Sequence, residues 1–199
     1  SKIAILKTGK MLGMNINNPG KIKSRYDYNM YVFEYDSLFT DIPMEIIIET
    51  SYYQTSYPVN KQQIKSFVGE FCEQNAINLP IQFDAKNIYM NVQSIERTFI
   101  DKVFAVCDYR IQNMQARESR HLYDICKLLS QVELNETLDK LIDDVREDRI
   151  LSKNHPSAQL IYNIPQMLKE IIDSRFFEKD YRNITQKLLY EDVDYDYAI

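Results

Sequence analysis

The sequence lacks any long uninterrupted run of apolar residues. Its longest apolar stretches, such as Met44–Ile48 and Val103–Cys107, are far shorter than the roughly 20 residues that a membrane-spanning helix requires. No charged-then-apolar signal segment opens the chain, so we expect a cytoplasmic protein without a membrane partner. With 199 residues, 45% hydrophobic and 27% charged, the chain has a globular composition and can bury one large core or two small ones.

Cysteine is scarce as well. Cys72, Cys107 and Cys126 are widely spaced, and each lies among apolar residues in a helical pattern. An odd number at such spacing argues against a disulfide framework and against a zinc site. We predict that all three are reduced residues of the core.

Acidic residues are missing from the first 26 positions. This segment carries a charge of +6, whereas the whole chain has a net charge of −5, so the remainder carries −11. A basic segment of this kind can meet phosphate groups, although a solvated helix face and loop explain the pattern equally well. The chain begins at Ser1 rather than Met, from which we expect either a tag remnant or an internal start.

Strand patterns fill the first half of the chain. The run Ile46-Ile47-Ile48 predicts a strand that is buried on both faces. Glu45 and Glu49 flank this run an even number of residues apart, so both should point to the same side of the strand. The β-branched and aromatic strand patterns cover residues 26–35, 44–53 and 88–93.

Helical patterns flank these strands and then fill the second half. A short helix opens the chain and ends near Gly13, and Asn60 is a suitable N-cap for a helix with an apolar stripe that ends before Pro80. Ser94 caps the first helix of the second half. Strands followed by helices predict an α+β fold with a helical tail. The expected helices of that tail cover residues 95–113, 118–130, 135–149, 157–173 and 178–190, with a kink or restart at Pro165.

One lysine breaks the pattern of its own helix. Residues 95, 99, 102 and 106 line one helical face, and Lys102 is the only charged side chain among them. Burying an ammonium group without a partner costs roughly several kcal/mol. Lys102 must therefore reach water or meet an anion.

Asp124 on the following helix is the candidate partner. It shares its side of the helix with His121 and Leu128, and an antiparallel hairpin would bring it to Lys102. A simple interhelical salt bridge is one interpretation. The nearby Arg117, Arg120 and His121 support another, a phosphate-binding cluster, because arginine binds phosphate oxygens bidentately.

These two motifs carry a family resemblance. The segments Ser94-Ile-Glu-Arg-Thr-Phe-Ile-Asp-Lys102 and Arg117-Glu-Ser-Arg-His-Leu-Tyr-Asp124-Ile resemble the AbiEii toxin family of nucleotidyltransferases. The similarity extends upstream to the strand ending Ile46-Ile-Ile-Glu49 and to Ser56-Tyr-Pro58. It is strongest over residues 26–130.

The resemblance implies a partial polymerase-β-like nucleotidyltransferase sheet in residues 1–93 and a helical domain in residues 94–199. The protein would transfer a nucleotide from a nucleoside triphosphate to an acceptor, with tRNA among the candidates, in a bacterial toxin–antitoxin or phage-defence pair with a cognate antitoxin. Mg²⁺ would be the cofactor.

The resemblance also implies roles for single residues. Glu49 matches the third acid of the metal site and Lys102 the lysine that contacts the nucleotide phosphates. Asp124 matches an aspartate required for activity, and Arg120 and His121 match positions lining the same pocket. With Arg117 as a further candidate substrate-binding residue, we expect these groups to face one hollow beside the strand that ends at Glu49.

One part of the family pattern is missing. A Gly-Gly or Gly-Ser loop followed by an Asp-x-Asp pair on a strand has no counterpart in the 199 residues, since Asp194-Tyr-Asp196 lies near the end of the chain. Without two metal ligands, nucleotide contacts should persist with little turnover, so we expect this chain alone to be inactive. The alternative is a non-catalytic module of such a system that binds a protein partner.

Overall fold

A computed structural model describes residues 2–16, 23–24, 28–36, 44–51, 57–78, 88–189 and 191–199. The chain divides into two compact units, Ser1–Thr55 and Ser56–Ile199. The predicted domain boundary at residues 93 and 94 falls inside the second unit, where the first long helix begins, and it stays a prediction.

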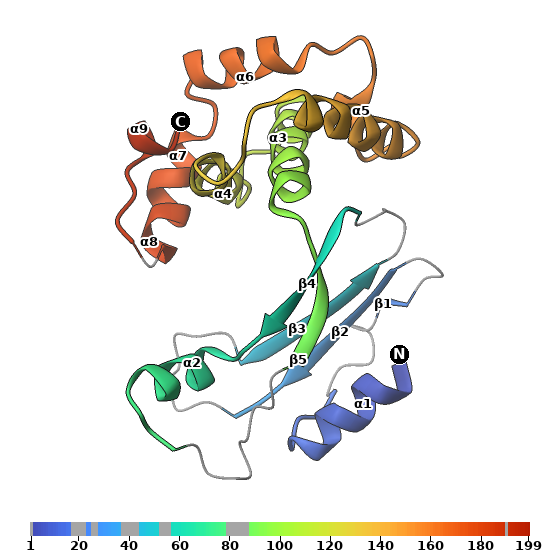
Figure 1. Ribbon diagram of the computed structural model, residues 1–199, viewed down its shortest axis with the longest axis vertical. Helices are drawn as coiled ribbons and strands as arrows, with labels where there is room; N and C mark the ends of the chain where they lie inside the picture. Colours follow the sequence, from blue (N-terminus) through green and yellow to red (C-terminus); the bar gives the residue numbers. More distant parts are fainter. Residues whose placement is uncertain are drawn as a thin grey trace. The chain divides into compact units, whose positions relative to one another are not determined.

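The first unit contains a three-stranded antiparallel sheet and one helix (Figure 1). The strand order is β1-β2-β3, and Met30 of the central strand lies opposite Glu49. Tyr31, Val32 and Phe33 of the central strand are buried. The elements are α1 (Lys2–Met11), β1 (Lys23–Ser24), β2 (Tyr28–Glu34) and β3 (Glu45–Ser51).

Helix α1 packs closely on the sheet at one glycine. A Cβ atom added at Gly9 would lie 2.1 Å from Cε1 of Phe33, so any larger residue would push the helix from the strand. A hollow lined by residues of α1, β2 and β3, among them Phe33, Ile46 and Ile48, marks the face of the sheet that the helix covers. The expected end of this helix near Gly13 is confirmed, with Gly13 at φ 72°.

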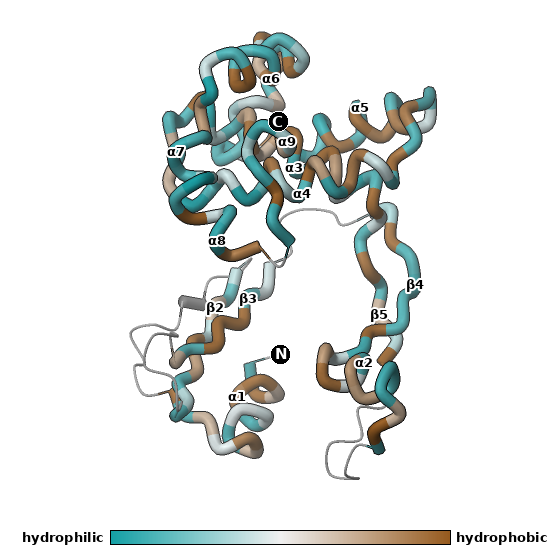
Figure 2. Tube along the Cα trace, turned by 90° about the vertical axis from the view of Figure 1, so that its left-hand side faces the viewer, coloured by the Kyte–Doolittle hydropathy of each residue, from teal (hydrophilic) through white to brown (hydrophobic). Residues whose placement is uncertain are grey.

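The prediction that β3 is buried on both faces is wrong. Ile46 is 40% and Ile47 57% exposed, although Figure 2 shows an apolar segment along this strand. Strand alternation puts Ile46 on the face toward α1 and Ile47 on the other, where no described element of this unit covers it. The three isoleucines were a signal of strand character, but a sheet of three strands with one helix buries little of either face.

The second unit begins with a two-stranded antiparallel sheet of β4 (Val59–Ile64) and β5 (Ile88–Gln93), with α2 (Phe67–Gln74) between them. The predicted N-cap at Asn60 is wrong, because Asn60 lies in β4 opposite Val92. Ser66 caps α2 instead, its side chain accepting from the Gly69 amide at 3.0 Å. Residues 59–64 pair with β5, so Ile64 is not part of the predicted apolar stripe of the helix. Phe67, which was predicted to lie on that stripe, is 91% exposed.

The helices of the second unit enclose its core. The predictions for residues 95–113, 118–130 and 135–149 are confirmed within a few residues, and Ser94 caps the first of them by accepting from the Arg97 amide at 3.1 Å. The predicted helix at 157–173 is split, because residues 159–163 are not helical and Asn163 caps a new helix with Pro165 in its first turn. The elements are α3 (Ile95–Ile111), α4 (Arg120–Leu129), α5 (Glu136–Ile150), η3 (Pro156–Ala158) and α6 (Ile164–Asp173).

The last segment was expected to be helical over 178–190. It forms α7 (Glu178–Asp180), the π-helical turn η4 (Tyr181–Thr185) and α8 (Gln186–Leu188), and Tyr190 lies outside the described residues. The short helix α9 (Tyr195–Ala198) follows, and its buried Tyr195 and Ala198 make the end of the chain a packed edge.

Small antiparallel sheets combined with many helices fit the predicted α+β class. The polymerase-β-like arrangement stays a prediction. In the described part of the chain, no helix has both the length and the apolar character needed to cross a membrane. Two of the cysteines, Cys72 and Cys107, are buried, Cys126 is partly buried, and all three are free thiols, as predicted.

Candidate functional site

Lys102 and Asp124 form an ion pair between α3 and α4. The Lys102 Nζ atom lies 2.8 Å from Oδ2 of Asp124, and the two side chains are 28% and 36% exposed. The predicted meeting of this cation and this anion is therefore confirmed, although the helices cross instead of running antiparallel: α4 is seen end-on in Figure 1 while α3 lies in the plane.

His121 completes this group of charges. Its Nδ1 atom lies 3.1 Å from the Lys102 ammonium and 3.7 Å from Asp124 Oδ2. The ring stacks on Tyr109 with their centroids 5.6 Å apart, which fixes its orientation. Lys102, His121 and Asp124 are called the cluster below.

The cluster keeps Asp124 ionised. Hydrogen bonding with His121 and then with Lys102 lowers the pKa of the Asp124 carboxyl, against the opposing effect of partial burial. A carboxylate of this kind is a poor proton acceptor at neutral pH. Asp124 is therefore better suited to holding the Lys102 ammonium than to accepting a proton.

Glu118 connects the cluster to Arg120. Its Oε2 atom lies 3.5 Å from Nε2 of His121 and 3.4 Å from Nη2 of Arg120. Burial, followed by the nearby Glu118 carboxylate, raises the pKa of Tyr109. Glu118 was not among the site residues predicted from the sequence, although its spacing of three residues from His121 places both on one side of the helix start.

The loop that carries Arg117 is held by the C-terminal helices. Asp180 accepts hydrogen bonds from the backbone amides of Arg117 at 2.8 Å and Ser119 at 3.2 Å. The Ser119 and Thr185 hydroxyls share a buried hydrogen bond of 2.7 Å. Asp180 is 9% exposed, so this anchor is shielded from water and fixes the start of α4. The sequence offered no signal for a contact across this separation.

A second group of charged residues, which was not predicted from the sequence, is buried between α3 and α5. Arg149 of α5 bridges two acids of α3, with Nη1 2.9 Å from Asp101 Oδ1 and Nη2 2.8 Å from Asp108 Oδ2. Ser157 donates to Asp108 Oδ1 from its amide at 2.8 Å and from its hydroxyl at 2.6 Å. Arg149 and Asp108 are 5% and 3% exposed. The spacing of seven residues between Asp101 and Asp108 was the available signal, since it aligns both acids on one helical face.

Arg97 extends this buried group to the strands. Its guanidinium contacts Asp101 at 3.1 Å, Asp148 at 3.1 Å and the carbonyl oxygen of Tyr57 at 3.0 Å. At 2% exposure it is among the largest fully buried side chains. Arg97 thus connects α3 to α5 and to the segment before β4. This residue of the segment Ser94–Lys102 therefore has a structural role.

Glu49 lies in the first unit and the cluster in the second, so their grouping in one site stays a prediction. The Glu49 carboxylate accepts a hydrogen bond from the Tyr28 hydroxyl, and Glu49 and Glu45 share a face of β3, as expected. Within the described ranges, no three His, Cys, Asp or Glu side chains are close enough to hold a metal ion. These residues therefore do not fit a magnesium site by themselves.

Comparison with known proteins identifies the family of the chain. Neither curated proteins nor solved structures gave a match. A family model described as nucleotidyl transferase AbiEii toxin, type IV TA system, matches residues 8–199 and so covers nearly the whole sequence, including both motifs that meet in the cluster. The chain belongs to the AbiEii family of nucleotidyl transferase toxins of type IV toxin–antitoxin systems.

Proposed function

We propose that the cluster binds the phosphates of a nucleoside triphosphate whose nucleotide the complete protein transfers to an acceptor hydroxyl. The observation that carries this proposal is the position of Lys102: its ammonium is partly exposed and directed by two neighbours, His121 and Asp124. These two contacts leave at least one of its three N–H groups able to reach a phosphate oxygen.

In the proposed reaction the acceptor hydroxyl oxygen attacks the α-phosphorus in line. The bond from the acceptor oxygen to phosphorus forms, the bond from phosphorus to the bridging oxygen breaks, and pyrophosphate leaves with the electron pair, while the acceptor hydroxyl releases its proton to water. Lys102 and Arg120 neutralise charge that develops on the phosphate oxygens, which is the main contribution a protein makes to phosphoryl transfer. Asp124 positions Lys102, and its lowered pKa keeps it ionised for that role.

The acceptor, tRNA among the candidates, and the cognate antitoxin belong to this proposal as expectations from the family. Glu49 as a metal ligand and Mg²⁺ as the cofactor belong to it as well. Any magnesium site needs ligands beyond those that the described residues bring together. For this reason we expect the 199-residue chain to bind nucleotides but to transfer them poorly.

The test is a transfer assay with protein expressed from the complete reading frame. Each of the four α-labelled nucleoside triphosphates is incubated with total tRNA, and labelled RNA is separated by electrophoresis. We expect labelled RNA with the unaltered protein and none with Lys102→Ala. Absence of incorporation by the unaltered protein, with every nucleotide and with both tRNA and other cellular RNA, would remove the enzymatic proposal.

A second candidate is the non-catalytic, partner-binding module. It is favoured by the apolar side of α2, where Phe67, Val68 and Phe71 are 91%, 63% and 58% exposed. Apolar side chains gathered on one surface often mark a protein interface. Under this alternative, Phe71→Asp abolishes binding of the cognate antitoxin while Lys102→Ala changes nothing. The reverse outcome supports the enzyme.

A further inference from the structure

Two buried polar atoms face each other at the start of α4. The Oε2 atom of Glu118 lies 3.5 Å from the Nε2 atom of His121. Both atoms are shielded from water, and in the described part of the chain neither has a regular hydrogen bond. Folded proteins rarely leave buried polar atoms without a partner, so each of these atoms is the natural partner of the other.

Such a pair needs one donor and one acceptor, and Arg120 indicates which is which. Its Nη2 atom lies 3.4 Å from the same oxygen of Glu118. A carboxylate that faces a guanidinium accepts hydrogen bonds and has none to donate. This arrangement favours His121 as the donor of the pair, with its proton on Nε2.

The other ring nitrogen of His121 faces Lys102. Its Nδ1 atom lies 3.1 Å from the ammonium nitrogen, and the Asp124 oxygen at 3.7 Å is too distant for a hydrogen bond with Nδ1. A proton on Nδ1 would point at an ammonium group, which has three N–H groups and no lone pair. With the proton on Nε2, Nδ1 instead offers its lone pair to Lys102. Both sides of the ring therefore favour the same tautomer.

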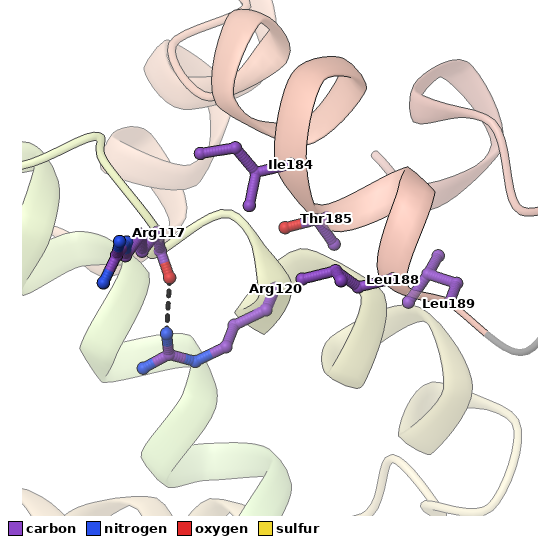
Figure 3. A pocket seen from close by; sticks show the side chains of 6 residues that line it. All are labelled: Arg117, Arg120, Ile184, Thr185, Leu188 and Leu189. Atoms are coloured by element: carbon purple, nitrogen blue, oxygen red, sulfur yellow. Dashed lines mark hydrogen bonds between the residues drawn. The ribbon is translucent and has the colours of Figure 1, made fainter. Parts of the chain in front are cut away.

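Glu118 also orients Arg120. Figure 3 shows the guanidinium of Arg120 reaching back to the loop, where Nη1 donates to the Arg117 carbonyl at 2.5 Å. Glu118 contacts the other terminal nitrogen, and its side chain is 16% exposed whereas that of Arg120 is 56% exposed. One shielded carboxylate thus contacts an exposed guanidinium directly and the Lys102 ammonium through His121.

We propose that Glu118 is a positioning residue for the two cations of the phosphate site. It keeps the proton of His121 on Nε2, which leaves Nδ1 as an acceptor that directs Lys102, and it orients Arg120. The inference rests on the proposed nucleotide binding for its consequence. The position of the proton can be tested without any nucleotide.

The test is heteronuclear NMR of the histidine side chains in the isotopically labelled 199-residue chain, which distinguishes a protonated ring nitrogen from a bare one. The chain has two histidines, so His155 is an internal reference and His121→Asn assigns the signals. Spectra are recorded about one pH unit above the ordinary pKa of histidine. We expect a neutral His121 ring with its proton on Nε2. A ring protonated on both nitrogens, or on Nδ1 alone, would overturn the proposal.

Removal of the carboxylate should release this proton. A hydrogen bond to a charged group changes an equilibrium about tenfold or more, so the ratio of the Nε2–H to the Nδ1–H form should fall at least about tenfold in Glu118→Ala. Glu118→Gln keeps an acceptor oxygen and should lower the ratio only about threefold, because a neutral hydrogen bond is about half as strong. If Glu118→Ala does not fold, Glu118→Gln carries the test, and an unchanged ratio there overturns the proposal.

Glu136→Ala is the matched control. It removes the same charge from an exposed position in the first turn of another helix, α5, and should leave the ratio unchanged. A merely structural role of Glu118 would lower the Tm without changing the tautomer ratio. An unchanged ratio in Glu118→Ala, or an equal change in Glu136→Ala, would therefore overturn the proposal.

Nucleotide affinity measures the consequence for the cations. Loss of a negative charge near a triphosphate would by itself tighten binding. We expect the opposite, about tenfold weaker binding by Glu118→Ala, about threefold weaker binding by Glu118→Gln, and no change in Glu136→Ala. Equal or tighter binding by Glu118→Ala would show that Glu118 does not position the cations. If no triphosphate binds the unaltered chain, the proposed function fails, whereas the spectra still confirm or overturn the pairing of Glu118 with His121.

Discussion

The Nζ atom of Lys102 lies 2.8 Å from Oδ2 of Asp124 and 3.1 Å from Nδ1 of His121. Water can replace the ammonium in this pair, because both side chains are partly exposed. We therefore predict that Lys102→Ala changes the free energy of unfolding by less than about 1 kcal/mol. Urea denaturation followed by circular dichroism measures this change. If Lys102→Ala unfolds and Lys102→Met restores the fold, the pair is structural and its binding role is wrong.

The pH dependence of stability should contain a contribution from Asp124. Its pKa in the folded protein is below 3.8, the ordinary value for an aspartate, so its stabilising effect is fully present above that value and is lost as the pH falls through the folded pKa. We predict that the difference in unfolding free energy between the unaltered chain and Asp124→Asn is constant above about pH 5 and shrinks below about pH 4. Urea titrations between these conditions measure it. A difference that grows on acidification would contradict the ionised, paired carboxylate.

The buried bridge from Arg149 to Asp101 and Asp108 should dominate the stability of the second unit. Arg149→Met leaves the buried Asp108 and the partly exposed Asp101 short of a partner, so we expect a loss of about 3–5 kcal/mol. Arg149→Lys should recover only part of it, because one ammonium cannot span both acids as the guanidinium fork does. Chemical denaturation of both variants gives the values. Full recovery by lysine would show that charge alone, without the fork geometry, suffices.

Replacing Gly9 by alanine should lower stability, although the same change in a helix usually raises it. Alanine in place of glycine inside a helix normally stabilises by about 0.5–1 kcal/mol. Here the added Cβ would meet the Phe33 ring at 2.1 Å, so we predict that Gly9→Ala destabilises the first unit by about 1–3 kcal/mol. Hydrogen exchange of the α1 amides reports on this packing. Combining Gly9→Ala with Phe33→Leu should restore protection, and stabilisation by Gly9→Ala alone would contradict the close approach.

Local signals predicted much of the second unit. Ser94 and the apolar periodicity after it placed α3, and the charged positions Lys102 and Asp124 broke their own patterns strongly enough to predict their contact. Such residues are informative because an isolated charge on a covered face needs a partner. The quoted motifs also led to the family that the chain matches.

Contacts between residues far apart in the sequence account for the features that local patterns did not predict. Asn60 and Ile64 fit a helical stripe, but pairing with β5 along the whole length of β4 outweighed that local preference. Asp180 reaches a loop 61 residues earlier, and no periodicity reports such a contact. Glu49 and the basic first segment belong to a separate unit, so sequence patterns alone could not fix their relation to the cluster.

The most direct test of the account is nucleotide binding by the 199-residue chain, measured by isothermal titration calorimetry with each of the four nucleoside triphosphates. The control is Lys127→Ala, which removes an exposed lysine from the same helix as Asp124. We predict that the unaltered chain and Lys127→Ala bind at least one triphosphate equally well, and that Lys102→Ala binds it at least about tenfold more weakly. Equal affinity of Lys102→Ala and Lys127→Ala, or no binding by the unaltered chain, would contradict a nucleotide site at the cluster.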